Sequence, residues 1–315
     1  MLDLLTQTVV SNLAVASLIA VVAFVVTRQA NRPTLAHLLW LLVLLKLVTP
    51  SIWHLPCKIP EAWAAQSQLE VDPLETSELA LADGIEPDQV IATPALATPI
   101  DWSQLRLLLL TSWAAGSLGL LFVSLTRVWR FHRVLSAHSI SECEKTQSIA
   151  FSLAQRLGLR TNFRVVLVNA NVAPLVWWTG GRPTIVLPTK ITKELSQTEL
   201  EFVLGHELAH ICRRDHIVRW LEWLVFVLTW WNPLAWLARK NLRQMEEICC
   251  DEFVLCRLKS QPSEYANSIL KTLEMLIQPV VRPPAMASQI NSGGILERRI
   301  KMIISGKVSK SNSRR

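Results

Sequence analysis

The sequence is short of charged residues. Only 18% of its 315 residues are Asp, Glu, Lys or Arg, whereas soluble domains carry about 25%. Half of the chain is hydrophobic, 13 residues are tryptophan, and the mean hydropathy is +0.30. This shortage argues against a wholly soluble protein and indicates a membrane protein with a modest water-facing part.

The chain also lacks internal repeats, paired cysteines and the marks of a cleavable leader. Its six cysteines form no C-x-x-C pair. We therefore expect them to be mostly reduced and buried, as on the cytosolic side of a membrane, with Cys57 as the exception. The first apolar run has neither a basic segment before it nor an A-x-A-like cleavage site, so we expect it to remain as an anchor.

Three apolar runs are long enough to cross a bilayer, which takes about 20 helical residues. They lie at about 9–27, 35–53 and 105–127. The second contains Lys46, which is costly in lipid unless it snorkels or pairs. Residues 54–104 hold nine acidic residues and one lysine, and this composition predicts a flexible loop outside the cytoplasm.

Basic residues beside these runs indicate an orientation. Arg28 and Arg32 follow the first run, and three arginines between 127 and 133 follow the third. Because basic loops stay in the cytoplasm, we predict an α-helical multi-pass protein of the inner (cytoplasmic) membrane with its N-terminus outside. Residues 128–278 are then a cytosolic domain, and residues 279–315 a basic cytosolic tail.

The predicted cytosolic domain begins with mixed helix and strand patterns. The segment "EKTQSIAFSLAQRLGL" has helical periodicity, and "FRVVLVN", "APLVWW" and "TIVLP" have the patterns of short strands. A further helix opens at Ser196, with Glu199 three residues later in a capping box. These patterns predict a small α+β domain.

That further helix carries His206, Glu207 and His210 in the pattern H-E-x-x-H. Residues four apart share one helix face, so both imidazoles can reach the same ion. Glu207 then lies beside the ion, where it can act as a general base towards water. Imidazole and carboxylate ligands with an open position are typical of catalytic zinc. The alternative is a helix with two unengaged histidines.

A catalytic zinc needs a third protein ligand, which the segment "RQMEEICCDEFVL" can supply. We expect Glu247 to bind the ion, with Glu246 as its rival. Asp251, one turn later, can orient a ligating histidine through its ring N–H. The alternative is a solvated acidic patch, but the apolar residues interleaved with these acids argue against it.

Residues 218–240 connect the two halves of this site and are apolar enough to span a membrane. If Glu247 binds the same ion as His206, however, the chain must return to the same side. Asn232-Pro233 interrupts the run, and proline ends one helix and suits the start of the next. We predict a helical hairpin that dips into the inner leaflet, its arms continuing the histidine helix and opening the Glu247 helix. The alternative is a true fourth span.

Together these motifs resemble the BlaR/MecR-type membrane metallopeptidases, the antirepressor class best known from beta-lactam sensing. The likeness covers about residues 105–303 and rests on "PLVWWTGGRPTIVLP", "LSQTELEFVLGHELAHICRRDH", "WWNPLAW", "EEICCD" and "ILERRI". It implies a small zincin-like (gluzincin) domain in which Zn2+ is bound by His206, His210 and Glu247. Glu207 would be the catalytic base, and Asp251 would support a ligand. A substrate peptide would add as an extended strand along the rim of the cleft, formed by Ala173, Pro174, Leu175, Val176 and Trp177.

The sequence departs from the well-known members in one respect. Those members continue into another span and an extracellular penicillin-binding sensor, whereas no S-x-x-K sensor motif follows the peptidase region before Arg315. We therefore do not expect beta-lactam sensing.

The expected function is a membrane-bound zinc endopeptidase that cleaves a cytosolic regulatory protein, such as a DNA-binding transcriptional repressor. The alternatives are a quality-control protease of the HtpX/Ste24 type and a catalytically silent signalling scaffold. We expect contact with membrane lipid and no direct nucleic-acid binding, because a solvated tail near the anionic leaflet explains Arg298, Arg299 and Lys301 more simply. A homodimer is left open. His216 and Arg214 are candidates for oxyanion stabilisation, although their place at the end of the motif helix favours a structural role.

Overall fold

The computed structural model describes residues 2–29, 32–49, 102–140, 144–275, 284 and 293–305. The chain divides into two compact units, one of residues 1–11 and 51–115, the other of residues 12–50 and 116–315. The predicted acidic loop at 54–104 and Cys57 lie outside the described residues, apart from the last positions of the loop. Every residue of the candidate site belongs to the second unit.

Two of the described helices are long and apolar enough to cross a membrane. They are α1 (Leu2–Gln29) and α5 (Trp102–His138). Helix α2 (Pro33–Val48) has 16 residues, about 24 Å at the usual rise, which is short of the roughly 30 Å hydrocarbon core. The sequence predicted three spans, so the structure supports two candidates, and the three-span layout stays a prediction.

A four-stranded sheet lies in the second unit. Its strands are β1 (Ser139–Ile140), β2 (Arg164–Val168), β3 (Leu175–Trp177) and β4 (Thr184–Pro188), in the order β1-β2-β4-β3. Strands β2 and β4 are parallel, and β3 pairs antiparallel to β4. Strand β3 therefore forms one edge of the sheet.

Alternate residues of the strands face two different layers, as strand geometry requires. Ile185 and Leu187 pack with α6 (Glu144–Leu157) and α8 (Gln197–Arg213). Val186 and Trp177 face the other way and pack against Phe131 of α5. The motif helix α8 thus lies directly on the sheet. A short helix, α7 (Thr189–Glu194), follows β4.

Helix α8 ends earlier than the sequence suggested. Arg214 adopts a left-handed backbone (φ 60°), and a new helix, α9 (Asp215–Leu228), begins at the next residue. The prediction that the first hairpin arm continues the histidine helix is therefore wrong, because this backbone break separates the two. The other arm is α10 (Pro233–Leu258), capped by the Asn232 side chain, which accepts from the Leu234 N–H at 2.9 Å.

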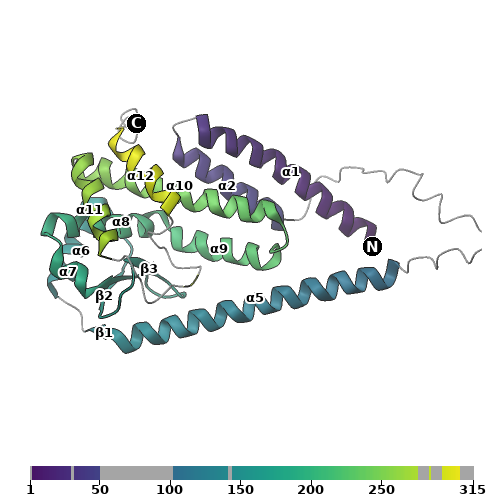
Figure 1. Ribbon diagram of the computed structural model, residues 1–315, viewed down its shortest axis with the longest axis horizontal. Coiled ribbons are helices and arrows are strands. Elements are labelled where there is room, and N and C mark those ends of the chain that lie inside the picture. Colours follow the sequence, from purple (N-terminus) through teal and green to yellow (C-terminus); the bar gives the residue numbers. More distant parts are fainter. Residues whose placement is uncertain are drawn as a thin grey trace, which may run out of the picture. The chain divides into compact units, whose positions relative to one another are not determined.

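The chain turns back at Asn232-Pro233, so that α9 and α10 contact each other (Figure 1). A buried glutamate, Glu222 of α9, joins the arms by accepting from Arg239 and Arg243 of α10. Apolar side chains of α1 and α2 pack against both arms. On α5, Gly116 lies so close to Trp230 that a Cβ there would be 2.5 Å from the indole ring.

Two further helices complete the second unit. Helix α11 (Pro262–Glu274) packs on α8, and α12 (Gly293–Ile304) packs on α10 and α11. The prediction that residues 279–315 form a basic tail is wrong for residues 293–304. Because α12 buries Ile303 and Arg299, this part of the chain belongs to the fold.

The cap of α8 gives a testable prediction. The Ser196 hydroxyl accepts from the Glu199 N–H at 3.3 Å, and the Glu199 carboxylate accepts from the Ser196 N–H at 2.7 Å. Replacing an N-cap serine by alanine costs about 1 kcal/mol. Ser196→Ala should therefore lower the melting temperature by about 2–4 °C, measured by thermal unfolding in detergent. Ser148→Ala is the control, since that exposed hydroxyl only donates to Lys145 one turn back. Equal shifts in both variants would contradict the cap's contribution.

Candidate metal centre

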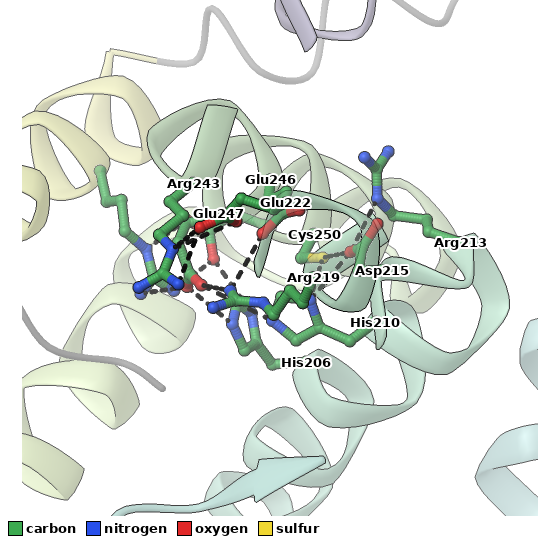
Figure 2. Close-up of polar contacts among 12 residues, drawn as sticks. His206, His210, Arg213, Asp215, Arg219, Glu222, Arg243, Glu246, Glu247 and Cys250 are labelled. Carbon is green, nitrogen blue, oxygen red and sulfur yellow. Dashed lines mark hydrogen bonds and ion pairs between the residues drawn. The ribbon is translucent and has the colours of Figure 1, made fainter. Parts of the chain in front are cut away.

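Three predicted ligands meet in the interior between α8 and α10. His206 and His210 lie one turn apart on α8, and Glu247 of α10 faces both (Figure 2). The Glu247 carboxylate oxygens lie 3.2 Å from His206 Nε2 and 3.7 Å from His210 Nε2. All three side chains are buried, and their donor atoms lie within 4.8 Å of one another.

The donor set fits zinc. Bonds of about 2.0 Å to a tetrahedral ion place neighbouring donors about 3.3 Å apart. The two nitrogen-to-oxygen separations of 3.2 and 3.7 Å are close to this value. Two imidazoles and one carboxylate also match the ligands of catalytic zinc sites, which keep one position open.

Small side chains let α8 and α10 approach closely enough for Glu247 to reach the two histidines. Gly205 precedes the motif, and a Cβ built there would lie 3.4 Å from Leu258 and 3.7 Å from Val254 of α10. Ala209 and Cys250 are fully buried at the same contact. Because larger residues here would push the helices apart, the reach of Glu247 to the histidines depends on these positions.

Each histidine is oriented by a second carboxylate. Asp251 lies 3.3 Å from His206 Nδ1, and Asp215 lies 2.9 Å from His210 Nδ1. A carboxylate at Nδ1 favours the tautomer whose Nε2 lone pair faces the site. The sequence predicted such a role for Asp251. It missed Asp215, which reaches His210 because the left-handed Arg214 restarts the chain as α9 at that point.

Two buried arginines balance these carboxylates. Arg299 of α12 donates two hydrogen bonds to Asp251, at 2.7 and 2.8 Å, and lies 3.0 Å from Glu247. Arg219 of α9 lies 3.0 Å from Glu246 and 3.6 Å from Glu247. The prediction that Arg299 lies in a solvated tail is wrong, because only 2% of this residue is exposed. The apolar spacing within "ILERRI" was the one sequence signal of a packed helix there.

Glu246, the rival ligand, faces a different group of side chains. Its carboxylate is fully buried and lies 3.0 Å from Arg219 and 4.0 Å from His37 of α2. The structure therefore brings Glu247, and not Glu246, to both motif histidines. Glu246 instead connects α10 to α2.

The remaining motif residue, Glu207, is buried among these groups. Only 1% of it is exposed, and its Oε2 atom has no hydrogen-bond partner among the described residues. Burial raises the pKa of this carboxyl, although His210 and His206 oppose the shift. A raised pKa suits a group that must both accept and return a proton near neutral pH.

Opposed effects also fix the charges of the ligands. Burial lowers the pKa of His206, but hydrogen bonds to Asp251 and Glu247 outweigh it and raise the pKa to about 9. Without a metal this ring is therefore protonated at neutral pH, and a metal ion must displace the proton to reach the Nε2 lone pair. Burial raises the pKa of Glu247, but Arg299 and the two histidines outweigh it and hold the pKa well below its usual range. The carboxylate is therefore ionised, as a metal ligand must be.

The predicted substrate strand lies at the sheet edge beside the centre. Leu175, Val176 and Trp177 form β3, preceded by Ala173 and Pro174. All five residues are buried, backbone and side chain together, so this edge is covered in the described structure. Beyond the strand, the Trp178 carbonyl accepts from Trp220 at 3.1 Å. The ring of His216 packs on the Trp178 ring at 5.2 Å between centroids, a contact that fits a structural role.

These features together match the ligand set of zinc metallopeptidases. The chain belongs to the BlaR1 peptidase M56 family, whose model matches residues 4–303. Over 91 residues it is 38% identical to the regulatory protein BlaR1 of Bacillus licheniformis, covering 29% of this chain and 15% of that protein. Over 241 residues it is 23% identical to the methicillin resistance mecR1 protein of Staphylococcus aureus (strain Mu50), covering 75% of this chain and 40% of that protein. The matches thus span less than half of the length of these relatives.

The buried position of Arg299 gives a second prediction. Removing one partner of a buried ion pair costs about 3–5 kcal/mol, and loss of a group that supports metal ligands lowers metal affinity about 10–100-fold. Arg299→Gln should therefore reduce both the melting temperature and zinc retention, with partial rescue by Arg299→Lys. Lys301→Gln on the same helix is the control, because its partner Glu297 is exposed. Zinc retention that is equal in the Arg299→Gln and Lys301→Gln variants would contradict this role.

Proposed function

We propose that this protein is a zinc endopeptidase embedded in a membrane. His206, His210 and Glu247 hold the metal, and Glu207 is the catalytic base. The observation that carries the proposal is the convergence of two imidazole nitrogens and one carboxylate oxygen within 4.8 Å in a buried site, next to a buried carboxyl. The domain around it is zincin-like, of the type in which a later helix supplies a glutamate ligand.

Bound zinc supplies Lewis-acid chemistry, polarising a peptide carbonyl and lowering the pKa of water. The residues of the chain do the remaining work. Glu207 accepts the proton of the attacking water and returns it to the leaving amine. Asp215 and Asp251 keep both imidazoles in the orientation that the metal needs, and Arg219 and Arg299 keep Glu247 ionised and in place.

Strand β3 offers a way to position the substrate. Among the described strands it pairs only with β4, so an extended peptide can pair with its other backbone edge once the residues that cover this edge move aside. Its side chains are buried in the core, which makes this edge rigid. We infer that β3 aligns the scissile bond by main-chain hydrogen bonds and that specificity comes from elsewhere in the cleft.

We further propose that the substrate is a cytosolic regulatory protein, such as a transcriptional repressor. Support comes from the two relatives, which are named as a regulatory protein and a methicillin resistance protein. The arginines after the first and third apolar runs favour a cytosolic site. The α9–α10 hairpin, packed against apolar helices α1 and α2, then lies at the inner leaflet, with the catalytic residues just beyond it.

Metal content tests the ligand assignment directly. The purified wild-type chain should hold about one zinc, as expected for a site with three protein ligands. Glu247→Gln should lower the affinity for zinc by more than the roughly 10–100-fold loss that is typical when a residue only supports a ligand. Glu246→Gln is a matched control, since it changes the neighbouring buried carboxylate that faces Arg219 and His37. Zinc is measured by mass spectrometry of metal after dialysis against graded chelator. Equal losses in the two variants would reject Glu247 as the specific ligand.

Peptide cleavage tests the catalytic base. Glu207→Gln should retain zinc but lose about 10²–10⁴-fold in cleavage rate, because general-base catalysis contributes about this much. The assay is cleavage of a mixed peptide library, followed by mass spectrometry, with zinc content measured on the same samples. Equal cleavage by both proteins would refute the role of Glu207. A wild type that binds zinc but cuts no peptide would favour the silent scaffold.

A further inference from the structure

A cavity that contains none of the proposed metal ligands lies where α1, α2, α10 and α12 meet. It has a volume of about 320 Å³. Four of its lining residues are basic, and none of the described lining residues is acidic. The basic residues come from the start of the chain and from near its end: Arg28, Arg32, Arg298 and Lys301.

The cations of this cavity are poorly neutralised. Lys301 pairs with Glu297 at 2.6 Å, but no ion pair joins the three arginines to any of the described carboxylates. Arg298 donates to the Thr27 carbonyl at 3.0 Å, which holds its guanidinium beside α1. Burial and the nearby Arg28 lower the pKa of Arg298, so the two arginines are close enough to repel each other. An anion placed between them would remove this repulsion.

The start of α2 adds a further positive element. This helix begins at Pro33, with Arg32 as an N-cap that makes no side-chain capping bond, and its first turn contains no acidic residue. The N-terminus of a helix carries a partial positive charge and free N–H groups, which favour a phosphate. The helix end and the basic side chains open onto the same cavity.

The rest of the wall is apolar. Ala36 of α2, Met245 and Ile248 of α10, and Met302 of α12 line it. The cavity therefore offers a charged half and an apolar half, which suits a phosphate group attached to a hydrocarbon-bearing backbone. Arg28 lies in the last turn of the apolar helix α1, and Arg32 follows the end of that helix, where a phospholipid headgroup would lie if α1 spans the bilayer.

We propose that this cavity binds a phosphate group, supplied by an anionic phospholipid or by a soluble phosphate compound. The evidence for this phosphate site does not rest on the proposed peptidase function. The cavity nevertheless lies next to the candidate metal centre. Met245 and Ile248 flank the Glu246–Glu247 pair in the sequence of α10, and Arg298 precedes Arg299 on α12. A bound phosphate would join α12 to the α1–α2 connection and so hold Arg299 against Glu247.

Thermal unfolding of the full chain in neutral detergent tests this site. The probes are phosphatidylglycerol, zwitterionic phosphatidylcholine with the same acyl chains, and glycerol 3-phosphate. Phosphatidylglycerol should raise the melting temperature in a saturable way, and phosphatidylcholine should not. The Arg28→Gln/Arg32→Gln variant should need at least about tenfold more lipid for the same shift, since loss of close charge contacts costs more than about 1.4 kcal/mol.

The matched control is Arg127→Gln/Arg130→Gln, which removes two arginines near the end of the other candidate span. It should respond like the wild type. If glycerol 3-phosphate gives the same saturable shift with the same dependence on Arg28 and Arg32, the site takes a soluble phosphate, and the proposal stands. No saturable response to either phosphate probe would overturn it. So would equal losses in both double variants, which would indicate diffuse attraction to anionic lipid. The single Arg32→Gln change, at an exposed side chain, keeps the test valid if the double variant does not fold.

Discussion

The burial of several carboxylates around two histidines is the constraint on which the rest of this structure depends. Glu247, Asp251, Asp215 and Glu246 are all nearly inaccessible, and an unpaired buried charge costs several kcal/mol. Their compensating cations come from different helices, Arg219 from α9 and Arg299 from α12. Helices α8 and α10, which carry the two histidines and Glu247, are therefore not sufficient to form the site. The site needs four helices in place at once, which explains why α12 belongs to the domain.

The break at Arg214 links this electrostatic arrangement to the apolar helices α1, α2 and α5. It ends α8, directs Asp215 back to His210, and starts α9. Helix α9 then carries Arg219 and packs with α5, α1 and α2. Glu246 continues this connection through its contact with His37 of α2. A displacement of the apolar helices would therefore act on groups one contact away from the proposed metal ligands.

Short sequence patterns predicted those parts of the structure that depend only on residues close together in the sequence. The capping box at Ser196 and the Asn232-Pro233 helix start were expected from short patterns, and both are confirmed. The meeting of Glu247 with the histidines followed from counting the ligands that zinc requires, and the side chains do lie together. Asp215 could not be predicted, because its role depends on one left-handed residue. Arg299 contacts Asp251 from 48 positions away, a separation at which neither periodicity nor capping gives a signal. Helix α2 ended sooner than its apolar composition suggested.

The Glu222 carboxylate, held between the two arms of the hairpin, has a consequence for how this protein is made. The acid is on α9, and the two arginines that donate to it, Arg239 and Arg243, are on α10. Glu222 would lose both of these partners if α9 entered lipid without α10, and a buried charge that lacks its partners is costly in lipid. If the hairpin dips into the bilayer as proposed, the two arms would therefore associate in water or at the headgroups before their apolar surfaces enter lipid. On that proposal the segment would insert as a folded pair, after α10 has been synthesised.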